Sequence, residues 1–127
     1  MSEHTEQAKV IAWARDNEYI CPELSMLFST LNGIPLLGIS GKVRAIIINH
    51  MKAEGMKVGV PDLLFFVARG GYHGLVIEMK VNKNKPTPEQ ATWLDRMHEQ
   101  GYLAVACWGA DEAKDVIASY LGRMDLL

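Results

Sequence analysis

Residues 59–80 constrain the fold more than any other stretch of this chain. The segment GVPDLLFFVA is an apolar run bounded by Pro61 and by Gly70-Gly71, and LVIEMKV (75–81) follows after a short turn. Short apolar runs bounded by proline or glycine are typical of buried β-strands, and two of them joined by a short turn predict a β-hairpin over residues 62–81. An antiparallel pair of strands therefore forms the expected centre of the fold.

The remaining segments alternate between predicted helices and strands. Periodicity and end signals predict helices over 3–16, 43–54, 87–100 and 111–121, a weak strand near 26–31 and a strand over 103–108. T-P-E-Q is a strong helix start, with Thr87 as N-cap, Pro88 as the first helical residue and Gln90 as capping-box partner. The order helix, strand, helix, strand, strand, helix, strand, helix indicates a mixed α/β domain.

Length and composition set the outer limits. A chain of 127 residues with 49% hydrophobic residues fits a single domain over residues 1–127, which would bury about two-thirds of its surface on folding. Cys21 and Cys107 lack the spacing of a zinc site or a disulfide framework. The start, MSEHTEQ, does not resemble a signal peptide, and no apolar run suits a membrane span. We expect a cytoplasmic protein with no membrane partner.

Charge is distributed less evenly than the net value of −2 suggests. Basic residues gather in two segments that contain few acids, and the candidates for contacts with nucleic acid are Lys42, Arg44, Lys52, Lys57, Lys83 and Lys85. Local basic segments on an acidic chain are compatible with a surface that follows phosphates. The alternative is an ordinary solvated face, and charge by itself favours that alternative.

Three charged residues on the predicted hairpin are candidates for chemistry. Glu78 and Lys80 are two residues apart on one strand and so project from one face, and Asp62 begins the neighbouring strand. If the register sets Asp62 beside Glu78, two carboxylates and an ammonium group converge at one end of the sheet. Carboxylate oxygens are ligands that Mg²⁺ prefers, and such a site could act on a phosphate. The alternative is a solvent-facing charge pair, but the flanking apolar residues make an unpaired charge costly there.

These residues stand in a longer pattern that resembles the VRR-NUC family of the PD-(D/E)xK nuclease superfamily. The family pattern is G-x-P-D-L, about a dozen residues, I-E-x-K, and then P/S-x-x-Q before a helix, where this chain reads T-P-E-Q. The matching residues are Gly59, Pro61, Asp62, Leu63, Ile77, Glu78, Lys80 and Gln90. K-A-E-G-M-K-x-G-V-P-D-L and G-Y-x-x-x-x-C-x-G-x-D-E-A also resemble phage members, so the resemblance covers nearly the whole chain. It implies a restriction-endonuclease-like core, a mixed central β-sheet flanked by helices.

The resemblance also implies a set of site residues. Metal ligands would be Asp62, Glu78, the backbone carbonyl of Met79 and an N-terminal glutamate, for which Glu3 is the first choice and Glu6 the second. Asp62, Glu78, Lys80 and Gln90 would form the catalytic set, with Gln90 beside Lys80 and the attacking water. Each of two residues also has a purely structural interpretation. Glu3 would then do no more than compensate the helix dipole, and Gln90 would do no more than complete the capping box.

One segment departs from the family pattern. Many relatives carry I-P-N-G-G-x-R before the second helix, whereas this chain has I-P-L-L-G-I-S-G-K-V-R, with Asn32-Gly33 ahead of Ile34. If that segment touches DNA, Lys42 and Arg44 are the candidates to replace its contacts. The alternative for both is an exposed helix start.

The function implied is a metal-dependent DNA endonuclease that uses Mg²⁺ or Mn²⁺. By analogy with stand-alone relatives from phages and bacteria, we expect a homodimer that cuts branched DNA such as a Holliday junction, in a bacterial or phage-infected cell. Two rivals remain: a non-catalytic nucleic-acid-binding or assembly module, and an α/β enzyme with a small-molecule substrate. Because Walker-type and GxGxxG loops are absent, no nucleotide cofactor is expected. The four histidines have no ligand spacing, and we interpret them as surface or turn residues.

Overall fold

A four-stranded mixed sheet organises the protein. The computed structural model describes residues 1–30 and 38–127. The strands are β1 (Leu27–Ser29), β2 (Leu63–Phe65), β3 (Leu75–Lys80) and β4 (Leu103–Trp108), in the spatial order β1-β2-β3-β4. Strand β2 is antiparallel to both β1 and β3, and β4 runs parallel to β3. The α/β class and the element order predicted from the sequence are confirmed.

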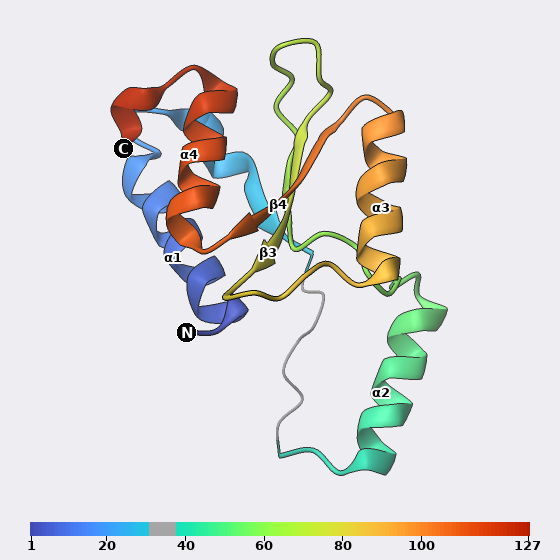
Figure 1. The fold of residues 1–127 in the computed structure, drawn as a ribbon. Helices are drawn as coiled ribbons and strands as arrows, with labels where there is room; N and C mark the ends of the chain where they lie inside the picture. Colours follow the sequence, from blue (N-terminus) through green and yellow to red (C-terminus); the bar gives the residue numbers. More distant parts are fainter. Residues whose placement is uncertain (31–37) are drawn as a thin grey trace.

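Helices cover the two faces of the sheet unequally. The α-helices are α1 (Glu3–Asn17), α2 (Gly41–Ala53), α3 (Pro88–Glu99) and α4 (Ala110–Leu121), with short 3₁₀ turns η1 (Pro22–Met26) and η2 (Met124–Leu126). In Figure 1, α1 and α4 lie on one side of β3 and β4, and α3 lies on the other. α2 stands apart below the sheet and contributes no buried residue. Within the described part of the chain, no helix is long and apolar enough to span a membrane.

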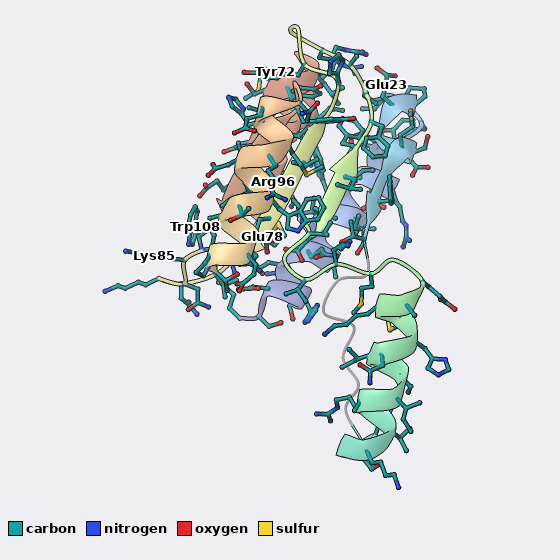
Figure 2. All side chains as sticks on the ribbon, turned by 90° about the vertical axis from the view of Figure 1, so that its right-hand side faces the viewer. Glu23, Tyr72, Glu78, Lys85, Arg96 and Trp108 are labelled. Carbon is teal, nitrogen blue, oxygen red and sulfur yellow. The ribbon has the colours of Figure 1, made fainter. Side chains whose placement is uncertain are left out.

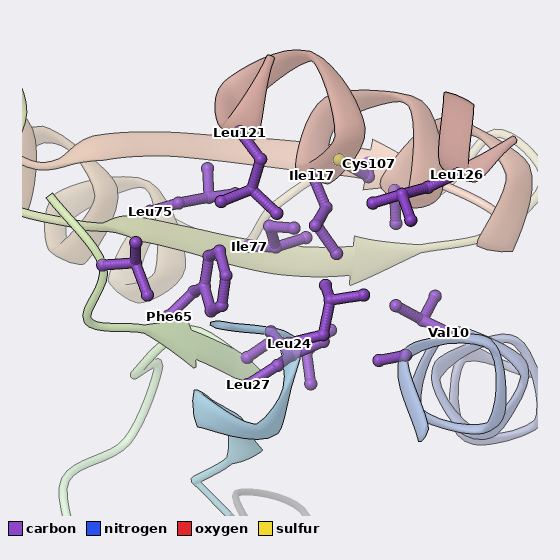
Figure 3. Packing of buried hydrophobic residues seen from close by; sticks show 14 of the residues in the cluster. Val10, Leu24, Leu27, Phe65, Leu75, Ile77, Cys107, Ile117, Leu121 and Leu126 are labelled. Carbon is purple, nitrogen blue, oxygen red and sulfur yellow. The ribbon is translucent and has the colours of Figure 1, made fainter. Parts of the chain in front are cut away.

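The hydrophobic core lies between the sheet and the α1/α4 layer (Figure 3). Leu63 and Phe65 of β2 and Leu75, Ile77 and Met79 of β3 all belong to it. Every residue of β3 is buried, including Glu78 and Lys80, which is more complete burial than the pattern of the strand predicted. Both cysteines are buried, Cys107 in β4 and Cys21 just before η1.

The predicted hairpin forms, but its first strand is shorter than the apolar run suggested. Leu63 pairs with Ile77 and Phe65 with Leu75, after which the chain leaves the sheet. The Tyr120 hydroxyl group on α4 donates to the carbonyl oxygen of Val67 at 2.6 Å and accepts from the Arg69 amide at 3.2 Å. A side chain from a distant helix thus satisfies backbone groups that a longer strand would have paired.

Helix boundaries follow the signals in the sequence. The Ser2 side chain caps α1, and the capping box of Thr87 and Gln90 starts α3. Gly122 ends α4 in the left-handed conformation, which favours glycine. The weak strand predicted near 26–31 is β1. The segment noted as departing from the family pattern spans residues 32–44, of which 32–37 lie outside the described residues.

Candidate active site

A cavity of about 310 Å³ opens where the N-terminus of α1, the start of β2, the end of β3 and the start of α3 meet. Its lining is polar and acidic for the most part and consists of Glu3, His4, Gln7, Val58, Gly59, Asp62, Glu78, Thr87, Glu89 and Gln90. The cavity therefore gathers residues from four segments that are far apart in the sequence. Four of the predicted site residues are among them: Glu3, Asp62, Glu78 and Gln90.

Strand pairing brings Asp62 to Glu78. Leu63 pairs with Ile77, and continuing this antiparallel register by one residue sets Asp62 opposite Glu78. One oxygen of Asp62, Oδ2, accepts a hydrogen bond of 2.7 Å from the backbone amide of Met79. The register that the sequence left conditional is thus the one that the structure has, and the Asp62 carboxylate is held by the backbone of β3.

Glu78 is an acidic residue in a buried environment that disfavours its charged form. Its side chain is almost fully buried, its Oε1 atom is inaccessible, and no N–H or O–H group of the described residues donates to that atom. The pKa of Glu78 is raised to about 9, chiefly because the group is buried and next because the Asp62 carboxyl group lies beside it, whereas Lys80 lowers this pKa by less. Without a cation, the paired carboxyl groups therefore hold a proton in the neutral range.

Gln90 does two things at once. Its backbone amide and side chain complete the capping box with Thr87, in which the Thr87 amide donates to Oε1 of Gln90 at 2.9 Å. Its Nε2 atom donates to Oε2 of Glu78 at 3.3 Å. The two interpretations of Gln90 from the sequence are therefore compatible, because one end of the amide caps the helix and the other contacts the buried acid.

Lys80 and the two candidate glutamates lie at the end of β3. Lys80 is buried, and its Nζ atom is 3.8 Å from Oε2 of Glu3, which is partly exposed at the cavity wall. Glu6 lies elsewhere: it is buried, its Oε1 atom accepts from the Ala110 amide at 3.1 Å, and its Oε2 atom is 2.6 Å from Nζ of Lys9. Of the two glutamates, Glu3 is the one beside the other acids.

The chain is similar to known proteins in both sequence and fold. The model of the VRR-NUC domain matches residues 1–111. The chain belongs to the VRR-NUC family. A solved structure described as a VRR_NUC domain protein is 28% identical in sequence and superposes with a TM-score of 0.76. The alignment covers 97% of this chain and 90% of the chain in that structure. No curated protein matches the chain. The family identifies a nuclease-type domain, for which DNA is the expected partner.

A divalent cation fits this VRR-NUC site in its chemistry, although the acids are not assembled as a complete ligand set. Among residues 1–30 and 38–127, no three Asp, Glu, His or Cys side chains form a group that could hold a metal ion. The buried Oε1 atom of Glu78 nevertheless lacks a donor, and the Asp62 carboxyl group lies beside it. A cation would compensate the two carboxylates, which in its absence are forced to keep a proton.

The basic residues expected to contact DNA lie outside the cavity, on two exposed segments. Lys42, Arg44 and Lys52 are on α2, and Lys57 follows it; Lys83 and Lys85 lie on the loop between β3 and α3. Arg44 Nη2 donates to the Ile39 carbonyl oxygen at 3.3 Å. The structure thus places one basic segment on the separate helix and the other between the strand and the helix that build the site.

Sequence reasoning missed two features of the site in this VRR-NUC chain. His4 was interpreted as a surface residue, and although exposed it lines the cavity, next to Glu3 on the first turn of α1. Gly59 was noted only as part of a motif, yet it is buried with φ +86°, and a Cβ there would lie 2.8 Å from the Glu89 carbonyl carbon. The indole Nε1 of Trp93 donates to the Val58 carbonyl oxygen at 3.1 Å. This clamp of residues 58–59 on α3 holds the segment before Asp62 against the helix that carries Gln90.

A larger groove of about 530 Å³ exists at the other end of the sheet. It is mainly apolar, with Leu103 and Val105 of β4 and Val116 and Tyr120 of α4 among its lining residues. Its one acidic lining residue is Asp115, so it lacks the paired carboxyl groups of the smaller cavity. The smaller cavity is the better candidate for nuclease chemistry.

Proposed function

We propose that this protein is a metal-dependent endonuclease that hydrolyses phosphodiester bonds of DNA. The observation that carries the proposal is the buried Glu78 carboxyl group, with an oxygen that no described group donates to, beside Asp62 in a cavity open to solvent. Burying two acids together is costly unless a cation compensates them. A role in binding a metal ion and a phosphate would explain why the protein keeps two buried acids despite this free-energy cost.

The proposed ligands for Mg²⁺ or Mn²⁺ are the carboxylates of Asp62, Glu78 and Glu3 and the backbone carbonyl group of Met79. When bound, the cation would polarise the scissile phosphate and lower the pKa of the attacking water. The amide of Met79 fixes the Asp62 carboxylate, and Gln90 orients Glu78 from the opposite side. Because both acids are held before the substrate arrives, little reorganisation is needed for the reaction.

Lys80 supplies positive charge at the reacting phosphate. Its ammonium group is buried on the strand of Glu78, and its nearest described acid oxygen is that of Glu3, at 3.8 Å. A salt bridge this long leaves donor capacity on the ammonium group for a phosphate oxygen. Lys80 would stabilise the charge that develops in the transition state and orient the attacking water. Attack in line with the leaving oxygen would give a 5′-phosphate product.

The exposed basic residues would bind the phosphates of the DNA backbone. Lys42, Arg44, Lys52 and Lys57 would act from the α2 segment, and Lys83 and Lys85 from the loop before α3. Contacts of this kind position DNA without reading its sequence and weaken as salt rises. We further propose that the enzyme acts as a homodimer on branched DNA, since two-fold symmetry of the protein matches that of a four-way junction.

The test is cleavage of supercoiled plasmid, linear duplex, flap and four-way junction with Mg²⁺ or Mn²⁺. Lys80→Ala should lower the rate by at least about 100-fold if the lysine serves the transition state. Lys114→Ala is the matched control, because Lys114 lies on α4 and pairs with Asp111 outside the cavity.

The panel separates the alternatives. Cutting of the junction alone supports the full proposal, and cutting of all four substrates keeps the nuclease while removing the selectivity for branches. DNA binding without metal-dependent cutting by the unaltered chain would favour a non-catalytic binding module.

A further inference from the structure

Helix α2 carries an apolar stripe of which no member is buried and two members are exposed. Val43, Ile46, Ile47 and Met51 follow the spacing of one helix face, and Val43 and Ile46 are 47% and 50% exposed. No residue of α2 is buried. A stripe of this kind is the part of a helix that normally packs on another element, so its exposure indicates a missing partner.

The same chain has a partly exposed apolar sheet surface, which we call the aromatic face: Phe28, Leu64 and Phe66. Leu27, Leu63 and Phe65 point into the core, so their neighbours Phe28, Leu64 and Phe66 point to the opposite side. Phe28 and Phe66 are 44% and 48% exposed and contact each other edge to face, with ring centroids 5.6 Å apart. Figure 2 shows α3 in front of one half of the sheet and no helix in front of β2.

The segment after α2 directs the helix away from its own aromatic face. Residues 58–59 are clamped to the start of α3 by the Trp93–Val58 hydrogen bond and by the close approach of Gly59 to Glu89. Only residues 54–57 separate α2 from this clamp, and the amides of Gly55 and Met56 bond back to Lys52 and Met51. With so short and structured a connection, α2 extends outward from the body in Figure 2.

Charge argues against pairing of α2 with a second α2. Between Gly41 and Ala53 the helix has no acidic residue, whereas Lys42, Arg44, His50 and Lys52 are basic or can become so. Two such helices side by side would repel each other. The aromatic face is uncharged and can accept the apolar stripe without bringing like charges together.

We infer that α2 of one copy packs across the aromatic face of a second copy, beside α3, and that the exchange is reciprocal. The inference rests on the proposed homodimer and names the surfaces that form it. Glu78 lies on the same side of β3 as the aromatic face, because Val76, two residues away, pairs with Leu64. The exchange would therefore bring the basic residues of one copy to the sheet face that carries the acids of the other.

Oligomeric state is the first test, measured by light scattering across a concentration series of the full chain. The wild type should dimerise, and Ile46→Gln and Phe66→Gln should each shift it toward monomer while keeping the far-ultraviolet circular dichroism spectrum. Ala45→Gln is the matched control, since residue 45 is exposed on the other side of α2 and its change should leave the dimer intact. A wild type that stays monomeric, or a dimer that neither variant weakens, would overturn the inference.

Cross-linking identifies the contact itself. Ile46→Cys and Phe66→Cys chains carrying different tags should be joined by a short bismaleimide only when they are mixed, and the buried Cys21 and Cys107 make the wild type the blank. Joining of Ile46→Cys to itself would show α2–α2 pairing, and a link within one doubly substituted chain would show closure onto its own face. Either result overturns the inference.

Two further variants keep this inference separate from the nuclease proposal. Lys80→Ala removes a proposed catalytic group outside the interface and should remain dimeric. Loss of DNA binding in Phe66→Gln with the dimer unchanged would mean that the aromatic face stacks bases, and would overturn the exchange. A wild-type dimer with the expected cross-link but no metal-dependent cleavage supports the interface and counts against the nuclease.

Discussion

The candidate active site and helix α2 differ in how their side chains are held. At the site, Asp62, Glu78 and Gln90 come from three different segments and are held by hydrogen bonds, and strand β3 is entirely buried. On α2, no residue is buried and an apolar stripe faces outward. One chain thus contains a region organised within the monomer and a region whose packing surface is unused. The proposed dimer would account for this difference, with the chemistry inside one copy and the assembly between two.

The sharpest test of the organised region is Glu78→Gln. The amide keeps the size of the side chain but cannot be an anionic ligand, so cleavage should fall by at least about 100-fold. Because the acid is buried beside Asp62 and carries a proton in the neutral range without metal, the fold should tolerate the change. Cleavage assays and thermal melting measure both effects, with Glu23→Gln, a surface residue paired with Arg69, as control. Unchanged cleavage would remove Glu78 from the proposed site.

Truncating one isoleucine in each region compares their contributions to stability. Ile77 is buried in the core, and its replacement by alanine should cost about 2–5 kcal/mol. Ile46→Ala, measured at concentrations too low for association, should change the free energy of unfolding by less than about 0.5 kcal/mol. Urea denaturation gives both values. A large effect of Ile46→Ala in the monomer would mean that α2 packs on its own chain.

Two glycines test whether the clamp before Asp62 positions the site. Gly59 and Gly55 both have positive φ, but only at Gly59 would a Cβ meet neighbouring backbone. Gly55→Ala should therefore cost only the strain of the left-handed conformation, about 1 kcal/mol, and Gly59→Ala should cost about 1–3 kcal/mol and also slow cleavage by displacing Gln90. Equal effects in denaturation and cleavage assays would show that the clamp has no role at the site.

The pH dependence of stability gives the signal most specific to Glu78. The pKa of Glu78 is raised to about 9 in the folded protein from an ordinary value of 4.5, so the folded state binds more protons than the unfolded state between these values. The contribution of Glu78 to stability is therefore fully present below about pH 4.5 and is lost as the pH rises toward 9. Denaturation without metal should show this decline, and Glu78→Gln should reduce it. Mn²⁺ should bind more tightly as the pH rises, because the proton and the cation compete for the same carboxyl groups.

Much of the fold could be predicted because its signals are local. The capping box of Thr87 and Gln90, the glycine after α4 and the paired apolar runs each specify an element from neighbouring residues alone, and each is present. The end of β2 at Phe65 could not be predicted, because the backbone beyond it bonds to a side chain from a distant helix: the Tyr120 hydroxyl group donates to the Val67 carbonyl oxygen. Nor could the sequence anticipate that Glu78 and Lys80 would both be buried, since their cover comes from other elements of the fold.

The candidate site shows the same division. Asp62, Glu78 and Lys80 were singled out from their spacing and their apolar surroundings, and Glu3 and Gln90 from a family resemblance. The presence of His4 and Gly59 at the cavity depends on where α1 and the start of α3 lie, which no spacing along the chain reports. Glu3 and Glu6 could not be separated by spacing, and the structure separates them because Glu6 contacts α4 while Glu3 faces Lys80.

The sequence by itself determined the elements, their order and the acids that face each other across the hairpin, because these follow from local propensity and from the two-residue period of a strand. Only the tertiary structure decided that Glu78 is buried with an oxygen that accepts no hydrogen bond from the described residues, and that no residue of the apolar stripe on α2 is buried. Burial and exposure depend on which distant segments of the chain pack together, and a local pattern of residues does not show which segments do so.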